Sequence, residues 1–158
     1  MQEGDQLAAL VDLVRALSDA SIPYALIGAI AVGIHTDFPR ATNDVDVAVA
    51  TPARAEVIAA LTSAGFSVTG EFPHSINLHH ASGEPVQVSF DAAFDPMIER
   101  AEAVLVGDTN VKILTKDDLI VSKERAASDP ARRRSKALRD QADLELLRGD
   151  VPEPDEGW

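Results

Sequence analysis

The fold of this chain is decided by residues 24–50, which read YALIGAIAVGIHTDFPRATNDVDVAVA. The stretch opens with a short apolar run, Tyr24–Ile27, typical of a buried strand, and then turns at Gly28 into a short helical segment. After a polar loop, residues 44–49 alternate an acidic or small side chain with valine, and this period of two predicts a second strand. The stretch therefore predicts a strand, a turn, a helix and another strand.

The second of these strands carries two carboxylates on one face. Because side chains on a strand alternate between faces, Asp44 and Asp46 point the same way, and the valines between and after them point into the core. Two carboxylates this close repel each other unless a positive charge lies between them. Mg²⁺ prefers carboxylate and phosphate oxygens. We therefore expect a metal site at Asp44 and Asp46, with a solvated strand end as the alternative.

The turn at Gly28 predicts a phosphate site next to the carboxylates. The first N–H groups of a helix point away from it and attract anions, and a glycine at that point lets a ligand approach the backbone. We expect the helix that follows to run from Ala29 to about His35. A turn that can hold a phosphate beside a carboxylate pair favours a site for a nucleotide and a metal ion.

The rest of the chain predicts an α/β (α+β) domain with a mixed sheet flanked by helices and with helices at its C-terminal end. Apolar residues at helical spacing, Leu7, Leu10, Val11, Val14 and Leu17, predict a first helix that Asp5 could cap. Further helices are expected over residues 51–64, 97–103, 116–127 and 131–147, and further strands over 66–69, 75–80, 85–90, 104–106 and 111–114. Residues 1–149 are expected to form one domain, and residues 150–158 an acidic, disordered tail.

Composition narrows the classes of function. The 158 residues hold 26 acidic and 14 basic side chains, for a net charge of -12, which repels bare nucleic acid and anionic membranes. There is no cysteine, so disulfides and thiolate metal sites are excluded. No apolar run reaches the ~20 residues that span a bilayer, and the N-terminal residues lack the basic region of a secretory signal. We expect a cytoplasmic protein that does not associate with membranes.

Three motifs in order resemble the nucleotidyltransferase superfamily. The most similar branch is that of the abortive-infection toxins of bacterial toxin–antitoxin pairs, which carries a Gly-Gly turn and an Arg-x-Thr-x-Asp-h-Asp run, h being hydrophobic. The matching residues here are Arg40, Thr42, Asp44 and Asp46, then Thr115–Leu119 with Lys123, then Arg139, Asp140, Asp143 and Leu144. The resemblance covers about residues 22–147, nearly the whole chain.

The resemblance implies transfer of a nucleoside monophosphate from a nucleoside triphosphate to an acceptor, which could be tRNA or protein. It implies that Asp44 and Asp46 bind Mg²⁺. It implies nucleotide-binding roles for the Gly28–Ala29 turn, Arg40, Thr42 and Lys123. A cognate antitoxin is the partner protein that such toxins would have.

The sequence departs from the family pattern at two positions. Ala29 stands where the family has a second glycine, and Gln87 stands where it has a third catalytic acid. Asp91 falls on the same strand face as Gln87 but ~13 Å further along, so it does not replace the missing acid without a bulge. Glutamine is a neutral ligand and a poor base. The alternative function is therefore a catalytically impaired member that binds nucleotide or a partner protein.

Other charged and metal-ligating clusters have simpler interpretations. His74, His79 and His80 lie near a hairpin, but neighbouring residues of a strand point to opposite faces, which argues against a zinc site. A basic run, Arg132, Arg133, Arg134 and Lys136, is interpreted as a solvated helix face, with contact to an RNA acceptor as the alternative. Asp140 and Asp143 are expected to form salt bridges with arginines.

Overall fold

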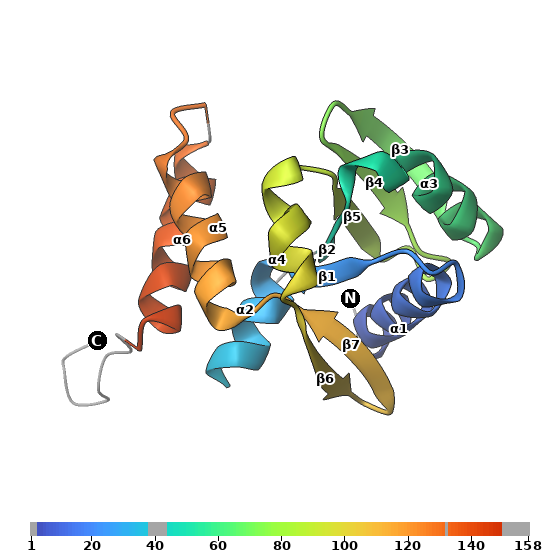
Figure 1. Cartoon of the computed structure of the whole chain (residues 1–158), viewed down its shortest axis with the longest axis horizontal. Helices are drawn as coiled ribbons and strands as arrows, with labels where there is room; N and C mark the ends of the chain where they lie inside the picture. Colours follow the sequence, from blue (N-terminus) through green and yellow to red (C-terminus); the bar gives the residue numbers. More distant parts are fainter. Residues whose placement is uncertain (1–2, 38–43, 132, 150–158) are drawn as a thin grey trace.

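The computed structural model describes residues 3–37, 44–131 and 133–149. They form a mixed α/β fold whose seven-stranded sheet has the order β3-β4-β5-β2-β1-β7-β6 (Figure 1). The helices are α1 (Glu3–Asp19), α2 (Gly28–Thr36), α3 (Arg54–Ser63), α4 (Asp95–Glu99), α5 (Lys116–Ser128) and α6 (Arg134–Leu147). The strands are β1 (Tyr24–Ile27), β2 (Val45–Val49), β3 (Ser67–Phe72), β4 (Ser75–His79), β5 (Pro85–Ser89), β6 (Glu102–Val106) and β7 (Thr109–Ile113). Short 3-10 turns, η1 (Thr51–Ala53) and η2 (Ala92–Phe94), precede α3 and α4.

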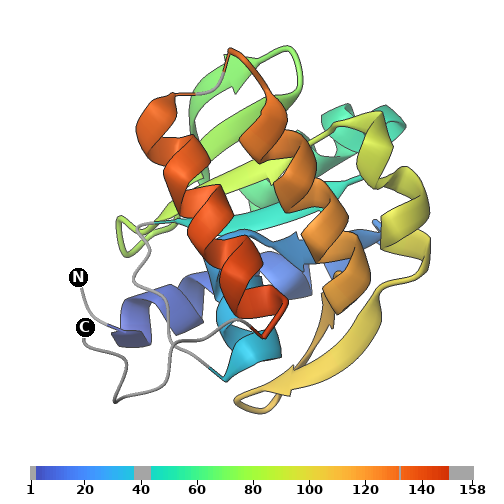
Figure 2. The same ribbon diagram turned by 90° about the vertical axis from the view of Figure 1, so that its left-hand side faces the viewer.

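Helices cover both faces of the sheet. Helices α1 and α3 lie on one side, and the α5–α6 pair lies on the other, as the two perpendicular views show (Figures 1 and 2). Helix α2 contacts β1, β2 and α6, so it joins the centre of the sheet to the C-terminal helices. The predicted fold class is therefore confirmed. The predicted tail, residues 150–158, lies outside the described residues, and the single-domain boundary stays a prediction.

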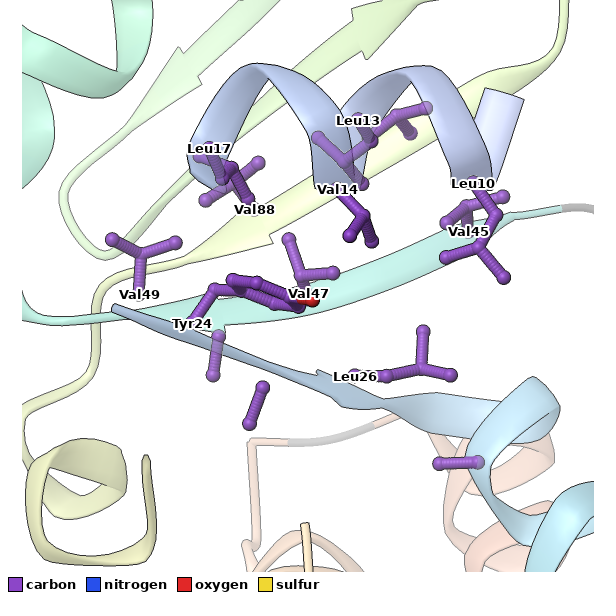
Figure 3. Packing of buried hydrophobic residues seen from close by; sticks show 14 of the residues in the cluster. Leu10, Leu13, Val14, Leu17, Tyr24, Leu26, Val45, Val47, Val49 and Val88 are labelled. Atoms are coloured by element: carbon purple, nitrogen blue, oxygen red, sulfur yellow. The ribbon is translucent and has the colours of Figure 1, made fainter. Parts of the chain in front are cut away.

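The core lies between α1 and the valine face of the sheet. Leu10, Leu13, Val14 and Leu17 of α1 face Val45, Val47, Val49 and Val88, all of them buried (Figure 3). The buried stripe of α1 differs from the predicted one. Leu7, which was predicted to belong to it, is 42% exposed, and Leu13 is buried instead. Asp5 does not cap this helix, which already begins at Glu3. Burial of the valines fixes the register of β2, because a slip by one residue would turn them toward solvent.

The region after β5 differs from the sequence prediction. We expected a helix over residues 97–103, but α4 ends at Glu99 and β6 begins at Glu102. Strand β6 pairs in register with β7 around the turn at Gly107, and this hairpin pairing overrides the helical spacing that residues 97–103 suggest. Similarly, α3 does not start at Thr51, because the turn η1 with Pro52 precedes it.

The start of α5 is fixed by a cap and an ion pair. Thr115 Oγ1 accepts a hydrogen bond from the Asp118 N–H at 3.1 Å, as the capping pattern predicts. The Asp118 carboxylate does not complete the capping box and instead accepts hydrogen bonds from Arg100 Nε at 2.9 Å and Nη2 at 2.8 Å. The hydrogen bond from Arg100 lowers the pKa of Asp118 below its ordinary value. This contact ties the end of α4 to the helix pair that covers the sheet.

Among the described residues there is no helix with the length and apolar character that crossing a membrane requires.

Candidate functional site

Asp46 is the second residue of β2, the central strand of the sheet. It pairs with Ile27 of antiparallel β1 on one side and with Gln87 of parallel β5 on the other. Its neighbours Val45 and Val47 are fully buried on the α1 side, so Asp46 points to the opposite face, where it is partly exposed. We call this opposite face of β2, β5 and β4 the site face.

Gly28 is in direct contact with the Asp46 carboxylate. Gly28 has φ +76°, and a Cβ added to it would lie 2.9 Å from Asp46 Cβ and closer still to Oδ2. The contact follows from the register, because Gly28 comes directly after Ile27, the partner of Asp46. Gly28 also begins α2, so the carboxylate lies at the positive end of a helix dipole. Turn, helix start and carboxylate thus form one compact unit.

We expect Gly28→Ala to cost about 2–4 kcal/mol of stability, because it combines a positive φ with a steric clash. Gly65 is the matched control, since its φ is +96° but nothing lies within 4 Å of an added Cβ. Gly65→Ala should therefore show only the backbone part of the cost, about 1 kcal/mol. Urea unfolding of both variants measures the difference. Equal losses would mean that the contact between Gly28 and Asp46 adds no constraint.

Asp44 comes directly before β2 and is partly exposed. It is two residues from Asp46, so the alternation of the strand directs both carboxylates to the site face. Their oxygens are the donors that a hard divalent cation prefers. Within the described residues no group of three or more His, Cys, Asp or Glu side chains could hold a metal ion. The site offers the two carboxylates of Asp44 and Asp46, and a metal ion bound to them stays a prediction.

Gln87 lies directly beside Asp46. The two residues are register partners of the parallel strands β2 and β5, and Gln87 also pairs with Asn77 of β4. Asp46, Gln87 and Asn77 therefore form one row across the site face, and all three are partly exposed. The amide of Gln87 occupies the position next to Asp46 where the family pattern expects a carboxylate. Asn77 was not identified from the sequence, although the hairpin turn at Ser82-Gly83 could have indicated its pairing with Gln87.

The Asp91 side chain makes its contacts away from the row of Asp46, Gln87 and Asn77. Its Oδ1 accepts a hydrogen bond from the Ala93 N–H at 2.9 Å, and its Oδ2 lies 3.7 Å from Arg125 Nη2. It follows β5 by two residues, and the last residue of that strand, Ser89, already pairs with Ala48 rather than Asp46. The described geometry shows no bulge in β5 that would bring Asp91 next to Asp46.

Lys123 lies between two carboxylates of α6. Its Nζ is 3.2 Å from Asp140 Oδ1 and 3.1 Å from Asp143 Oδ2, and its side chain is only 15% exposed. Asp140 and Asp143 therefore form ion pairs, as predicted, but the cation placed between them is a lysine rather than an arginine. A contact between Lys123 and a phosphate stays a prediction, and it would compete with both carboxylates.

The other predicted site residues are spread more widely. Ala29 lies in the first turn of α2 and is partly exposed. Arg40 and Thr42 lie outside the described residues. His79 is exposed at the end of β4, whereas the His80 ring contacts Asp12 Oδ2 at 2.7 Å from Nε2 on the α1 side. The two adjacent histidines thus point in different directions, as their alternation predicts.

A central Asp-x-Asp strand held against a glycine turn and a helix start, within a mixed sheet, defines the nucleotidyltransferase class of fold. The family comparison agrees, because residues 5–156 match the model described as "Nucleotidyltransferase of unknown function (DUF6036)". The chain belongs to this family. None of the curated proteins matches the chain in sequence.

Several solved structures share the fold. The antibiotic-resistance factor ANT(2'')-Ia has a TM-score of 0.65 and 16% identity, over 94% of this chain and 92% of that one. The lincosamide antibiotic adenylyltransferase LnuA has a TM-score of 0.63 and 13% identity, over 96% and 99% of the two chains. A Thermotoga maritima protein, whose assignment as a nucleotidyltransferase is provisional, has a TM-score of 0.62 and 10% identity, over 96% of this chain and 97% of that one. At these identities the likeness concerns the fold.

Proposed function

We propose that this protein transfers a nucleoside monophosphate from a nucleoside triphosphate to an acceptor hydroxyl. The observation that carries the proposal is the contact between the Gly28 turn and the Asp46 carboxylate. It brings a helix N-terminus suited to a phosphate against the acid pair of β2. Membership of a nucleotidyltransferase family supports the same reaction.

In this reaction the acceptor oxygen attacks the α-phosphorus, and pyrophosphate leaves with the electron pair of the broken bond. The residues that would hold a divalent cation, Mg²⁺ by their oxygen chemistry, are Asp44 and Asp46. When bound, such a cation neutralises charge on the phosphates and orients them. The protein itself contributes the backbone N–H groups after Gly28, which bind phosphate oxygens, and the rigid strand that fixes both carboxylates.

The acceptor is proposed on the basis of charge. A net charge of -12 opposes the approach of a polyanion, so tRNA is disfavoured relative to a neutral or cationic acceptor. The exposed cations Arg133, Arg134 and Lys136 at the start of α6 are the local exception that an RNA acceptor would need. Among the structural neighbours, ANT(2'')-Ia is known in complex with adenylyl-2''-tobramycin, and LnuA with lincomycin bound. A hydroxyl-bearing amine is therefore the first acceptor class to test.

A second function is favoured by one observation, the amide of Gln87 in the row beside Asp46. A member without the third acid would bind nucleotide and act through a partner protein instead.

The sequence motifs suggest a narrower form of the proposed enzyme. In this form the protein is the toxin of a toxin–antitoxin pair, and its partner is a cognate antitoxin.

The decisive experiment is calorimetric titration of the four nucleoside triphosphates, with Mg²⁺ and with a chelator, into the native chain and the double variant Asp44→Asn/Asp46→Asn. We expect binding that needs Mg²⁺ and is lost in the double variant. The preferred triphosphate is then incubated with tobramycin, lincomycin or tRNA, and the products are analysed by mass. If no triphosphate binds, the proposed function is rejected.

A further inference from the structure

In the row across the site face the two residues beside Asp46 are amides, and the proposed function uses the Asp46 carboxylate to hold the cation. A hydroxyl acceptor must lose its proton as it attacks phosphorus, and a positioned base speeds this step by about 10²–10⁴-fold. Gln87, beside Asp46, is an amide and cannot act as that base. Asp91 is held by the Ala93 N–H and lies near Arg125. Any proton acceptor on β5 or β4 must therefore be another side chain of the same face.

The strand register places one such side chain there. Val45 pairs with Val86, so Asp44 lies level with Pro85, and Pro85 in turn pairs with His79 of β4. Because His79 is two residues from Asn77, its side chain points to the site face. It lies two strands from Asp44, a separation of about 10 Å. Between them lies Pro85, which is partly exposed.

The acidic side chains near the β4–β5 hairpin do not point to the site face. Glu84 pairs through its carbonyl with the His80 N–H and is 1% exposed on the α1 side, where Asp12 also lies. Glu71 pairs with Ile76, a buried residue of the α1 side, and lies 3.9 Å from Arg54. The direct register partners of His79 itself are Ser67 on β3 and Pro85 on β5, neither of which is charged.

The His79 ring is also available. It is exposed, and within the described part of the chain no hydrogen bond or ion pair holds it. His80, by contrast, is fixed by Asp12 and by Ser82 Oγ at 2.8 Å from Nδ1. An imidazole exchanges protons near neutral pH, which suits a general base.

We infer that His79 is the proton acceptor of the transfer reaction, in place of the acid that Gln87 replaces; this inference rests on the proposed function. The acceptor lies over Pro85 and Gln87, between Asp44 and His79. Its oxygen forms the bond to the α-phosphorus, its proton passes to a ring nitrogen of His79, and pyrophosphate leaves with the electrons of the broken bond. The neighbouring Asn77 and Gln87 amides hydrogen-bond the acceptor and set its orientation.

The test compares His79→Gln with His74→Gln, which removes another exposed histidine from the opposite end of β4. Pyrophosphate release from each Mg²⁺–triphosphate is measured with water as acceptor, from pH 5.5 to 8.5, alongside calorimetric binding of the triphosphate. We expect His79→Gln to lower the rate about 100-fold and to abolish its fall at low pH, with triphosphate affinity unchanged. His74→Gln should keep the native rate and pH profile.

A rescue variant separates a chemical role from a structural one. Gln87→Glu places a carboxylate beside Asp46, so His79→Gln/Gln87→Glu should regain at least tenfold of the lost rate. A His79→Gln rate within threefold of the native rate overturns the inference while leaving the proposed function intact. A native chain that binds no triphosphate overturns both.

Discussion

Replacing Lys123 with methionine is expected to lower the free energy of unfolding by about 3–5 kcal/mol. The Lys123 ammonium lies 3.2 Å from Asp140 and 3.1 Å from Asp143, whose side chains are 2% and 4% exposed. Methionine keeps the apolar stem but removes the charge, so two carboxylates in a poorly solvated position lose the cation they share. Breaking a buried ion pair from one side is costly because the remaining charge is not resolvated.

The same helix pair provides the control. Arg148 of the α6 end lies 2.9 Å from Glu124 of α5, but both side chains are about half exposed, 45% and 51%. Arg148→Met should therefore cost less than ~1 kcal/mol. Chemical denaturation of both variants, monitored by circular dichroism, gives the comparison. Equal losses would show that burial adds nothing to the Lys123 pairs. The triple variant Lys123→Met/Asp140→Asn/Asp143→Asn should recover part of the loss, because it also removes the two charges.

The sequence predicts most elements of the fold because their patterns are local. The alternation in β2 and the breaks at Pro23 and Gly28 depend only on neighbouring residues, and each appears in the structure. The helix expected over residues 97–103 exists but ends earlier, because α4 covers Asp95–Glu99 and the residues from Glu102 onward pair with β7 in a hairpin. The order of strands in the sheet depends on pairing between segments far apart in the chain, such as β2 with β5, so local patterns do not predict it.

The candidate site was predictable to the extent that it depends on alternation and turns. Asp44, Asp46 and Gly28 could be named from spacing, and their proximity follows from the register of β1 with β2. The positions of Asn77 and His79 beside them depend on which strands are adjacent, and β2 pairs with β5 across a long stretch of chain. Burial of Lys123 against α6 likewise depends on tertiary packing, so a lysine that resembles a phosphate ligand is found between two carboxylates.

Asp46→Asn is expected to reduce nucleotidyl transfer about 1,000-fold, equivalent to ~4 kcal/mol of transition-state stabilisation. Asparagine has nearly the same shape as aspartate, so the contact with Gly28 and the pairing with Ile27 and Gln87 should persist. What is lost is one of the two negative charges that would hold the cation and its triphosphate. The melting temperature should therefore stay near the native value while both transfer and Mg²⁺-dependent triphosphate binding fall.

The matched control for this variant is Asp91→Asn, also an isosteric loss of one charge close to the site face. Because the Asp91 side chain accepts a hydrogen bond from the Ala93 N–H, which an asparagine oxygen can also accept, its structure should be kept. Transfer by Asp91→Asn should remain within about threefold of the native rate, since Asp91 follows β5 beyond the row that contains Asp46 and Gln87. Transfer at the native rate by Asp46→Asn, or an equal loss in both variants, would mean that the acid pair of β2 is not where the triphosphate reacts.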